Sequence, residues 1–167
     1  MKFNNMKCGL AAVVLSLVFS VSCANGDENS RTLSNTEIVA WTKAICTQYY
    51  VPLGAKGKMV VFIEVSTSKE PWSGGDSLKL DDSFFAEISS KQVRFLREQD
   101  ISSELDKINT DTHVFRATFY PFAASFQQGQ KQVLVPVKNG DIQKWRQCVY
   151  KLSNEQTGWK LLSMDQQ

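Results

Sequence analysis

Hydrophobic and polar residues alternate along the end of the chain, from residue 131 to residue 164. Two alternating runs, at 132–137 and 145–152, are typical of half-buried strands. Asn139-Gly140-Asp141 lies between them and favours a tight hairpin turn. The polar segment 154–158 predicts a second turn before a third strand at 158–164. The pattern therefore predicts a three-stranded antiparallel meander.

Near residue 33 the pattern is helical instead. Ser34 and Glu37 have the spacing of a capping box, and the apolar residues Leu33 and Ile38 flank them as a hydrophobic staple. Apolar side chains then recur at the period of a helix, at Ile38, Trp41, Ile45 and Tyr49. A helix that reaches about residue 50 follows from this pattern, and Pro52-Leu53-Gly54 is expected to end it.

Further elements are predicted between these two regions. The β-branched run 58–65 predicts a strand, with a buried helix segment as the alternative, and 66–80 is a polar loop. Asp81-Asp82-Ser83 is typical of a helix N-terminus. The apolar side of that helix would contain Phe84, Phe85, Ile88, Phe95 and Leu96. The charged segment 98–107 predicts a turn or short helix, and the following alternation predicts a strand that Pro121 ends.

The first 32 residues differ from the rest in composition. Lys2 and Lys7 form a positive start, and 9–21 is an uncharged, mostly apolar stretch followed by small residues. This order is typical of a secretory signal, and the apolar stretch is too short to span a bilayer, which takes about 20 residues. We therefore expect a signal peptide at 1–23, a polar tether at 24–32 and a single folded domain at 33–167.

Two cleavage reactions fit the end of this signal. Ser22-Cys23-Ala24 is a small-x-small site for ordinary signal peptidase, which would release a chain that starts at Asn25. Ser20-Val21-Ser22-Cys23 instead resembles a bacterial lipobox, in which the cysteine becomes the lipidated first residue, although Ser20 stands where leucine is usual. The polar stretch after Cys23 suits a tether to a lipid anchor. We favour lipidation of Cys23, and the Ala24 that follows resembles a signal for the outer membrane.

The charge of the chain argues against one class of partner. It contains 19 Lys and Arg residues and 17 Asp and Glu residues, and Lys2 and Lys7 of the signal account for the difference. The chain without its signal is therefore neutral, and its sequence contains no basic run. Because binding of nucleic acid needs a basic patch or stripe, we expect no nucleic-acid partner.

Two cysteines, Cys46 and Cys148, follow the signal. Exported proteins fold in an oxidising compartment, where an even pair of cysteines predicts a disulfide. It would join the first helix to the middle strand of the meander and close a loop of about 100 residues, worth about 4–5 kcal/mol in the chain-entropy model. Two cysteines and one histidine spread over the chain are a poor metal site, so we expect no metal and no cofactor.

One local group of residues has the side chains that general acid–base catalysis uses. It consists of Asp111, His113 and Tyr120, and the apolar segment around Phe122 would line a pocket beside it or fill the core. No nucleophile or second carboxylate lies at an evident spacing from Asp111 and His113. We therefore predict no enzyme activity. The alternative is a pocket enzyme that uses Asp111, His113 and Tyr120, which requires that the three side chains converge on one pocket.

The order of the predicted elements resembles a known fold family. The matching parts are the helix at 38–50, the segment Leu80-Asp81-Asp82-Ser83-Phe84-Phe85 that enters the second helix, and the three strands of the meander, the last of which begins with Gly158-Trp159-Lys160. They are similar to the cone-shaped fold of nuclear transport factor 2 and its cystatin-like relatives, and to small bacterial envelope lipoproteins with such a domain. The resemblance implies an α+β fold, with N-terminal helices packed on a curved antiparallel sheet, and it supplies no catalytic residues.

These observations lead to an expected function. We expect an exported, lipid-anchored and nonenzymatic envelope protein, whose pocket or sheet face binds a small ligand or a protein partner. It would face the periplasm from the outer membrane, or diffuse in the periplasm if Cys23 is not lipidated. A periplasmic immunity or inhibitor protein that blocks a toxin or a hydrolase is an alternative compatible with the same size, charge and location.

Overall fold

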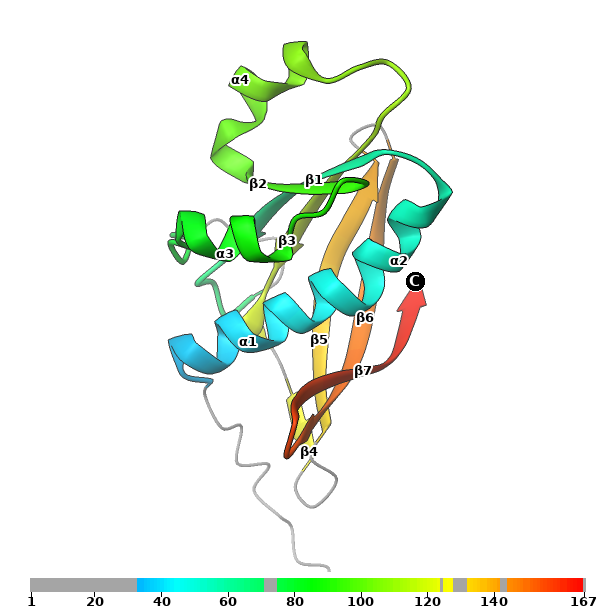
Figure 1. Cartoon of the computed structure of the whole chain (residues 1–167). Helices are drawn as coiled ribbons and strands as arrows, with labels where there is room; N and C mark the ends of the chain where they lie inside the picture. Colours follow the sequence, from blue (N-terminus) through cyan, green and yellow to red (C-terminus); the bar gives the residue numbers. More distant parts are fainter. Residues whose placement is uncertain (1–32, 71–74, 124, 128–131, 142–143, 167) are drawn as a thin grey trace, which may run out of the picture.

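The computed structural model describes residues 33–70, 75–123, 125–127, 132–141 and 144–166. The expected signal peptide, the tether and Cys23 lie outside the described residues. The fold is α+β, as the sequence predicts, with helices packed on a sheet (Figure 1). No helix in the described ranges is long and apolar enough to cross a membrane.

The domain begins with a helical run that extends past the expected end. It consists of α1 (Asn35–Ile45), a π-helical turn (Cys46–Tyr50), α2 (Val51–Leu53) and a 3₁₀ turn (Gly54–Lys56). The capping box is confirmed. The Ser34 amide donates to the Glu37 carboxylate at 3.0 Å, and the Glu37 amide donates to the Ser34 hydroxyl at 3.3 Å.

The segment Pro52-Leu53-Gly54, predicted to end this helix, contains the end of its α-helical part, because α2 stops at Leu53 with Gly54 as its C-cap; Pro52 itself, however, lies within the helical run. Proline has no amide hydrogen, and its ring collides with the carbonyl four residues earlier in a regular helix. Here a wide π turn comes first, in which the Val51 amide bonds to the Cys46 carbonyl. Pro52 then lies in the first turn of a new helix, where its missing amide hydrogen costs nothing. The helical run therefore continues through Pro52 to Lys56.

Within the described residues, seven strands form one mixed sheet. In the order β2-β1-β3-β5-β6-β7, β1 pairs in parallel with β2 and β3, all later pairs are antiparallel, and β4 pairs with β5. The strands are β1 (Met59–Val65), β2 (Val93–Arg97), β3 (His113–Phe119), β4 (Ser125–Gln127), β5 (Gln132–Asp141), β6 (Lys144–Glu155) and β7 (Gly158–Gln166).

The expectation of an antiparallel sheet is therefore wrong for the first three strands. The connection from β1 to β2 contains α3 (Asp82–Ile88), and the connection from β2 to β3 contains α4 (Ile101–Glu104). A helical crossover returns the chain to the sheet in the same direction, which makes the joined strands parallel. The predicted strand at 58–65 and the predicted short helix at 98–107 are both confirmed.

The second helix is shorter than its apolar pattern predicts. Phe95 and Leu96, expected on that helix, belong to β2 instead. Two serine side chains interrupt the helix: the hydroxyls of Ser89 and Ser90 accept hydrogen bonds from the amides of Phe95 and Val93, each at 3.0 Å. Such bonds compete with helical ones, and the parallel pairing with β1 holds the following residues extended.

The predicted meander is present as β5, β6 and β7. Its first turn is not where the sequence places it, because Asn139, Gly140 and Asp141 stay within β5 and pair with β3, Gly140 opposite Arg116. The connection from β5 to β6 contains residues 142 and 143, outside the described residues. The second turn is as predicted, and Gly158 has a φ of 113°, a backbone conformation that favours glycine.

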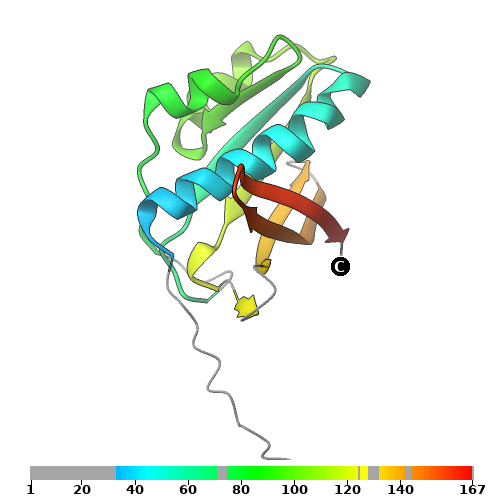
Figure 2. The same ribbon diagram turned by 60° about the horizontal axis from the view of Figure 1, so that its bottom comes forward.

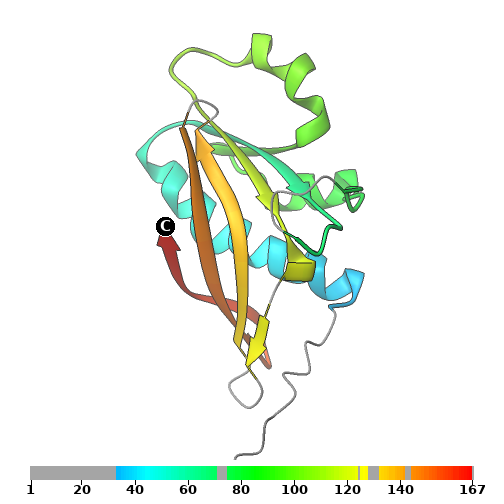
Figure 3. The same cartoon turned by 180° about the vertical axis from the view of Figure 1, so that it is seen from behind.

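The main core lies between α1 and the sheet. Figure 2 shows α1 along one face of the sheet, and Figure 3 shows β5 and β6 from the opposite side, with α1 behind them. Trp41 and Ile45 of α1 are fully buried against this face, together with Tyr150 and Leu152 of β6. Phe62 of β1 is buried on the opposite face, which the turn after β2 contacts.

The side chain of Gln48 occupies part of the outer edge of β7. Its amide group donates to the Trp159 carbonyl at 2.8 Å and accepts from the Leu161 amide at 2.9 Å. A neighbouring strand would make the same pair of bonds. Because open edge strands recruit other chains, Gln48 blocks strand addition along the first half of β7.

Candidate functional site

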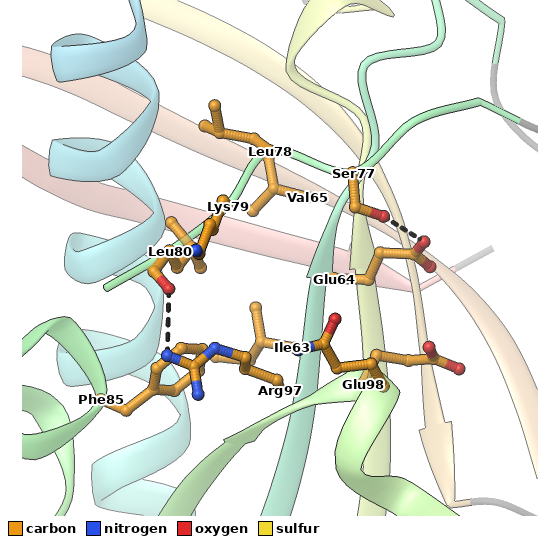
Figure 4. A pocket seen from close by; sticks show the side chains of 11 residues that line it. Ile63, Glu64, Val65, Ser77, Leu78, Lys79, Leu80, Phe85, Arg97 and Glu98 are labelled. Carbon is orange, nitrogen blue, oxygen red and sulfur yellow. Dashed lines mark hydrogen bonds between the residues drawn. The ribbon is translucent and has the colours of Figure 1, made fainter. Parts of the chain in front are cut away.

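The candidate site is a pocket at the carboxyl ends of the parallel strands. It has a volume of about 410 Å³ and is lined by the ends of β1 and β2, the loop 77–80 and α3 (Figure 4). From β1 the chain passes to β2 on one side and then to β3 on the other, so the connections run in opposite directions around β1. Ligands of open parallel sheets bind outside the carboxyl ends of the strands, which is the side where this pocket lies.

One wall of this pocket is apolar and rigid. It contains Ile63 and Val65 of β1, Leu80 of the loop and Phe85 of α3. Their exposed fractions run from 1% for Val65 to 8% for Phe85, so these side chains also belong to the packed core. Close-packed cores deform little, and the wall therefore keeps its shape whether or not a ligand is bound.

Glu64, next to the end of β1, provides a carboxylate in the pocket. Its side chain is half-buried and accepts hydrogen bonds from the hydroxyls of Ser77, at 2.7 Å, and Thr118, at 3.3 Å (Figure 4 draws the first). In the part of the chain that the structure describes, no Lys, Arg or His nitrogen lies within 4.0 Å of this carboxylate. A carboxylate has about four acceptor positions, so the two hydroxyls leave room for further donors.

Arg97, at the end of β2, is held by protein groups on the same side of the pocket as α3. Its guanidinium donates to the Leu80 carbonyl at 3.3 Å and forms an ion pair with Asp82. It also lies over the ring of Phe85, with 5.1 Å between the guanidinium carbon and the ring centroid, which adds a cation–π contact. Arg97 therefore joins β2, the loop and α3, and Asp82 compensates its charge.

The second carboxylate of the pocket has a cationic partner. Glu98, which follows β2, forms an ion pair with Arg116 of β3. Lys79, a further cation of the lining, is exposed. Glu64 therefore differs from Glu98 in that its described partners are neutral hydroxyl groups.

The structure does not bring Asp111, His113 and Tyr120 together. His113 begins β3 and is exposed, whereas Tyr120 follows the end of β3 and is buried. Seven residues of extended strand span about 23 Å, so the two side chains lie at opposite ends of β3. Asp111 is exposed in the turn before β3, and Phe122 is half-buried against the main core. None of the four residues lines the pocket that contains Glu64.

The predicted disulfide is not present in the structure. Cys46, in the π-helical turn, and Cys148, in β6, are both buried thiols. They lie in the region of Tyr50 and Tyr150, whose hydroxyls are 3.2 Å apart in the core. Burial raises the pKa of the Cys46 thiol far above its ordinary value, which keeps it neutral. Both cysteines therefore act here as small apolar side chains of the core.

Sequence reasoning missed Glu64, although a signal for it exists. Glu64 is the one charged residue in the apolar run of β1, at 59–65. A charge inside a strand that is otherwise buried costs free energy unless it has a partner, so such a residue is a functional candidate. Ser77 and Arg97 carry no comparable signal, because their role depends on where the loop and β2 meet β1.

A metal site and a similarity to known proteins would each indicate a function independently of this pocket. Among the described residues, no group of three or more His, Cys, Asp or Glu side chains could hold a metal ion. Comparisons of the chain with protein-family models, with curated proteins and with solved structures give no match. The resemblance to nuclear transport factor 2 and to envelope lipoproteins therefore stays a prediction, and the family of this chain is not assigned by similarity.

Proposed function

We propose that this chain is an exported, lipid-anchored and nonenzymatic envelope protein that binds a small cationic ligand in the Glu64 pocket. The observation that carries the proposal is the Glu64 carboxylate, half-buried in a pocket of about 410 Å³ and bonded to two hydroxyls. Taking a charge out of water costs free energy unless an opposite charge or enough donors compensate it. A cationic group of the ligand would supply this compensation.

The rest of the pocket suggests what the ligand carries besides its charge. The volume is in the range of pockets for small molecules, about 300–1,000 Å³. The wall formed by Ile63, Val65, Leu80 and Phe85 offers apolar surface across the end of β1 from the carboxylate, because neighbouring side chains of a strand point to opposite faces. Burial of an apolar group there would contribute about 25 cal/mol per Å². The ligand class that fits is an amine with an aliphatic or aromatic body.

A binding role is favoured over catalysis by the arrangement of the polar groups. Acid–base chemistry needs a positioned pair or chain of groups within hydrogen-bond reach of the reacting atoms. The candidate pair of His113 and Tyr120 lies at opposite ends of β3. In the Glu64 pocket, Glu98 and Arg97 are engaged with Arg116 and Asp82. These ion pairs make them structural groups of the wall.

The location in the proposal is supported by the sequence of the first 32 residues. Lys2, Lys7 and the apolar stretch 9–21 are typical of an export signal, and Cys23 has a small residue on each side. Residues 24–32 are polar and would hold the domain away from the membrane. The domain itself begins at Leu33, whose side chain is buried against the core.

Titration with a simple amine tests the ligand class. The probes are benzylamine, which is cationic at neutral pH, and benzyl alcohol, its neutral analogue, titrated by isothermal calorimetry into the chain purified from expressing cells. We expect benzylamine to bind at least about tenfold more tightly, because hydrogen bonds between charged groups are worth about 1.5–3 kcal/mol. Glu64→Gln should remove this difference.

The matched control for Glu64→Gln is Glu155→Gln, which makes the same charge change at the exposed end of β6. Glu155→Gln should bind benzylamine as the unmodified chain does. Equal affinity for the two probes, or an unchanged preference in Glu64→Gln, would show that Glu64 does not recognise a cation.

The mass of the intact chain from the membranes of an expressing bacterium tests the location. We expect a chain that begins at Cys23 and carries the added mass of a lipid anchor, and a Cys23→Ala variant without it. A chain that begins at Asn25 would rule out the lipid anchor and would still show that the protein is exported. A chain that retains residues 1–22 would contradict export itself.

A further inference from the structure

A second pocket lies at the other edge of the sheet, at the amino ends of the parallel strands. It has a volume of about 150 Å³ and is lined by residues at the starts of β1 and β2, by the end of the segment 98–107 and by Thr112, just before β3. Backbone bonds close this region: the His113 amide donates to the Lys58 carbonyl at 2.9 Å, and the Met59 amide donates to the Gln92 carbonyl at 2.8 Å. The positions of the lining residues are therefore fixed by the sheet.

Four cationic residues line this pocket, and no carboxylate is part of its lining. They are Lys58, Lys91, Arg94 and Lys107. One carboxylate lies nearby: Glu104 accepts from Arg94 at 3.4 Å and from Lys107 at 2.7 Å. In the described ranges, no carboxylate lies within 4.0 Å of the Lys58 or Lys91 ammonium group.

This concentration of positive charge has no counterpart in the sequence. The chain that follows the signal is neutral, and the four cations come from segments up to 49 positions apart, Lys58 and Lys107 being the extremes. Like charges around one small pocket repel one another, and an anion between them would turn this repulsion into attraction. Glu104 compensates for part of the charge of Arg94 and Lys107, and the charges of Lys58 and Lys91 remain for a ligand.

We propose that this pocket binds a phosphate group. Phosphate is a compact anion with several acceptor oxygens, which suits a volume of about 150 Å³ and a lining that includes Lys58, Lys91 and Arg94, whose exposed side chains carry ammonium and guanidinium donors. Gln92, Asn109 and Thr112 add neutral donors to the lining. The site is at the opposite edge of the sheet from Glu64 and has the opposite charge, so the inference does not depend on the cationic ligand proposed above.

Calorimetric titration with inorganic phosphate tests this proposal. The unmodified chain is titrated at constant ionic strength, with chloride replacing phosphate in the reference, so that screening and general salt effects cancel. We expect saturable binding, and Lys58→Gln and Lys91→Gln should each weaken it by at least about tenfold, the effect of one lost charge-assisted bond. Lys91→Arg should retain binding.

The matched control is Lys69→Gln, which removes one exposed lysine from a loop that does not line this pocket. It should bind phosphate as the unmodified chain does, and so should Glu64→Gln. Melting temperatures in chloride should be the same for all variants, which shows that each is folded. Equal weakening by Lys69→Gln and Lys91→Gln would overturn the proposal.

A second measurement distinguishes the two sources of such a group, a lipid headgroup and a soluble phosphate. Vesicles of phosphatidylglycerol and of phosphatidylcholine are sedimented with the Cys23→Ala chain, which carries no lipid anchor of its own. If phosphatidylglycerol vesicles bind it, and phosphate or Lys91→Gln releases it, the group is that of an anionic lipid. If phosphate binds but no vesicle does, the ligand is soluble. Failure of both probes would rule out a phosphate site.

Discussion

Gly54→Ala provides the sharpest test of the packing. We expect this substitution to destabilise the protein, whereas a glycine in an ordinary backbone conformation is usually stabilised by replacement with alanine. The Gly54 φ of −64° is ordinary for any residue, and replacing such a glycine by alanine normally stabilises a protein by about 0.4–1 kcal/mol, since the unfolded chain loses freedom. Here, however, a Cβ atom on Gly54 would lie 2.0 Å from Cγ2 of Val93. The helical run and β2 are too close for the added methyl group.

The magnitude follows from the two opposing terms. Val93 is 0% exposed and β-branched, so its side chain has little freedom to rotate away. Overpacking a core by one methyl group costs about 1–3 kcal/mol, which exceeds the entropic gain. We expect Gly54→Ala to lower the free energy of unfolding by about 1–2 kcal/mol.

A double-mutant cycle with Val93→Ala separates the clash from other effects. Val93→Ala alone should cost about 1.5–3 kcal/mol through lost burial and a cavity. In that background the Cγ2 atom is absent, and Gly54→Ala should become stabilising, so that the two substitutions couple by about 2 kcal/mol. The assay is urea unfolding followed by tryptophan fluorescence, with linear extrapolation. A stabilising Gly54→Ala in the unmodified chain, or additive effects in the cycle, would refute the close contact.

Three further predictions test other parts of the fold. Ser34→Ala should lower the free energy of unfolding by about 1 kcal/mol through loss of the capping box, whereas Thr36→Ala, on the exposed side of the same turn, should change it by less than about 0.5 kcal/mol in urea unfolding. Tyr150→Phe should lower the free energy of unfolding by about 1–3 kcal/mol, because it leaves the Tyr50 hydroxyl in the core without the partner that lies 3.2 Å away. Adding Tyr50→Phe should recover part of this loss. Additive effects of the two substitutions would contradict the pairing. Stability should also fall at alkaline pH. Burial raises the pKa of the Cys46 thiol above its ordinary 9.0 and the pKa of the Tyr50 hydroxyl above its ordinary 10.0. The folded state therefore keeps protons that the unfolded state releases. Each group then lowers the free energy of unfolding by about 1.4 kcal/mol for every pH unit above its ordinary pKa. In a pH series of urea unfolding, Cys46→Ala should reduce the loss that begins near pH 9 by the share of this one thiol, and a slope unchanged by Cys46→Ala would contradict that contribution.

Part of the candidate site could be predicted from the sequence. Glu64 stands out as a charge within an apolar strand, and its strand is predicted correctly. The pairing of Glu64 with Ser77 and Thr118 could not be predicted, because the three residues are up to 54 positions apart and meet only when β3 pairs with β1. The same holds for the separation of His113 from Tyr120, since their proximity in sequence conceals the length of an extended strand.

The sequence by itself determined the local structure wherever the signal is local. The capping box at Ser34 and Glu37 and the turn at Gly158 depend on residues within a few positions of one another, and the structure contains both. Such features follow from hydrogen bonds and side-chain periodicity, which any isolated stretch of chain can express.

Only the tertiary structure decided how these pieces combine. Phe95 joins a strand and not a helix because β1 offers a parallel partner, and Gly140 stays extended because β3 pairs with it. The neutral chain that follows the signal acquires a carboxylate pocket at one edge of its sheet and a cationic pocket at the other. The physical reason is that backbone pairing and the fields of charges act over distance in space, whatever the separation along the chain.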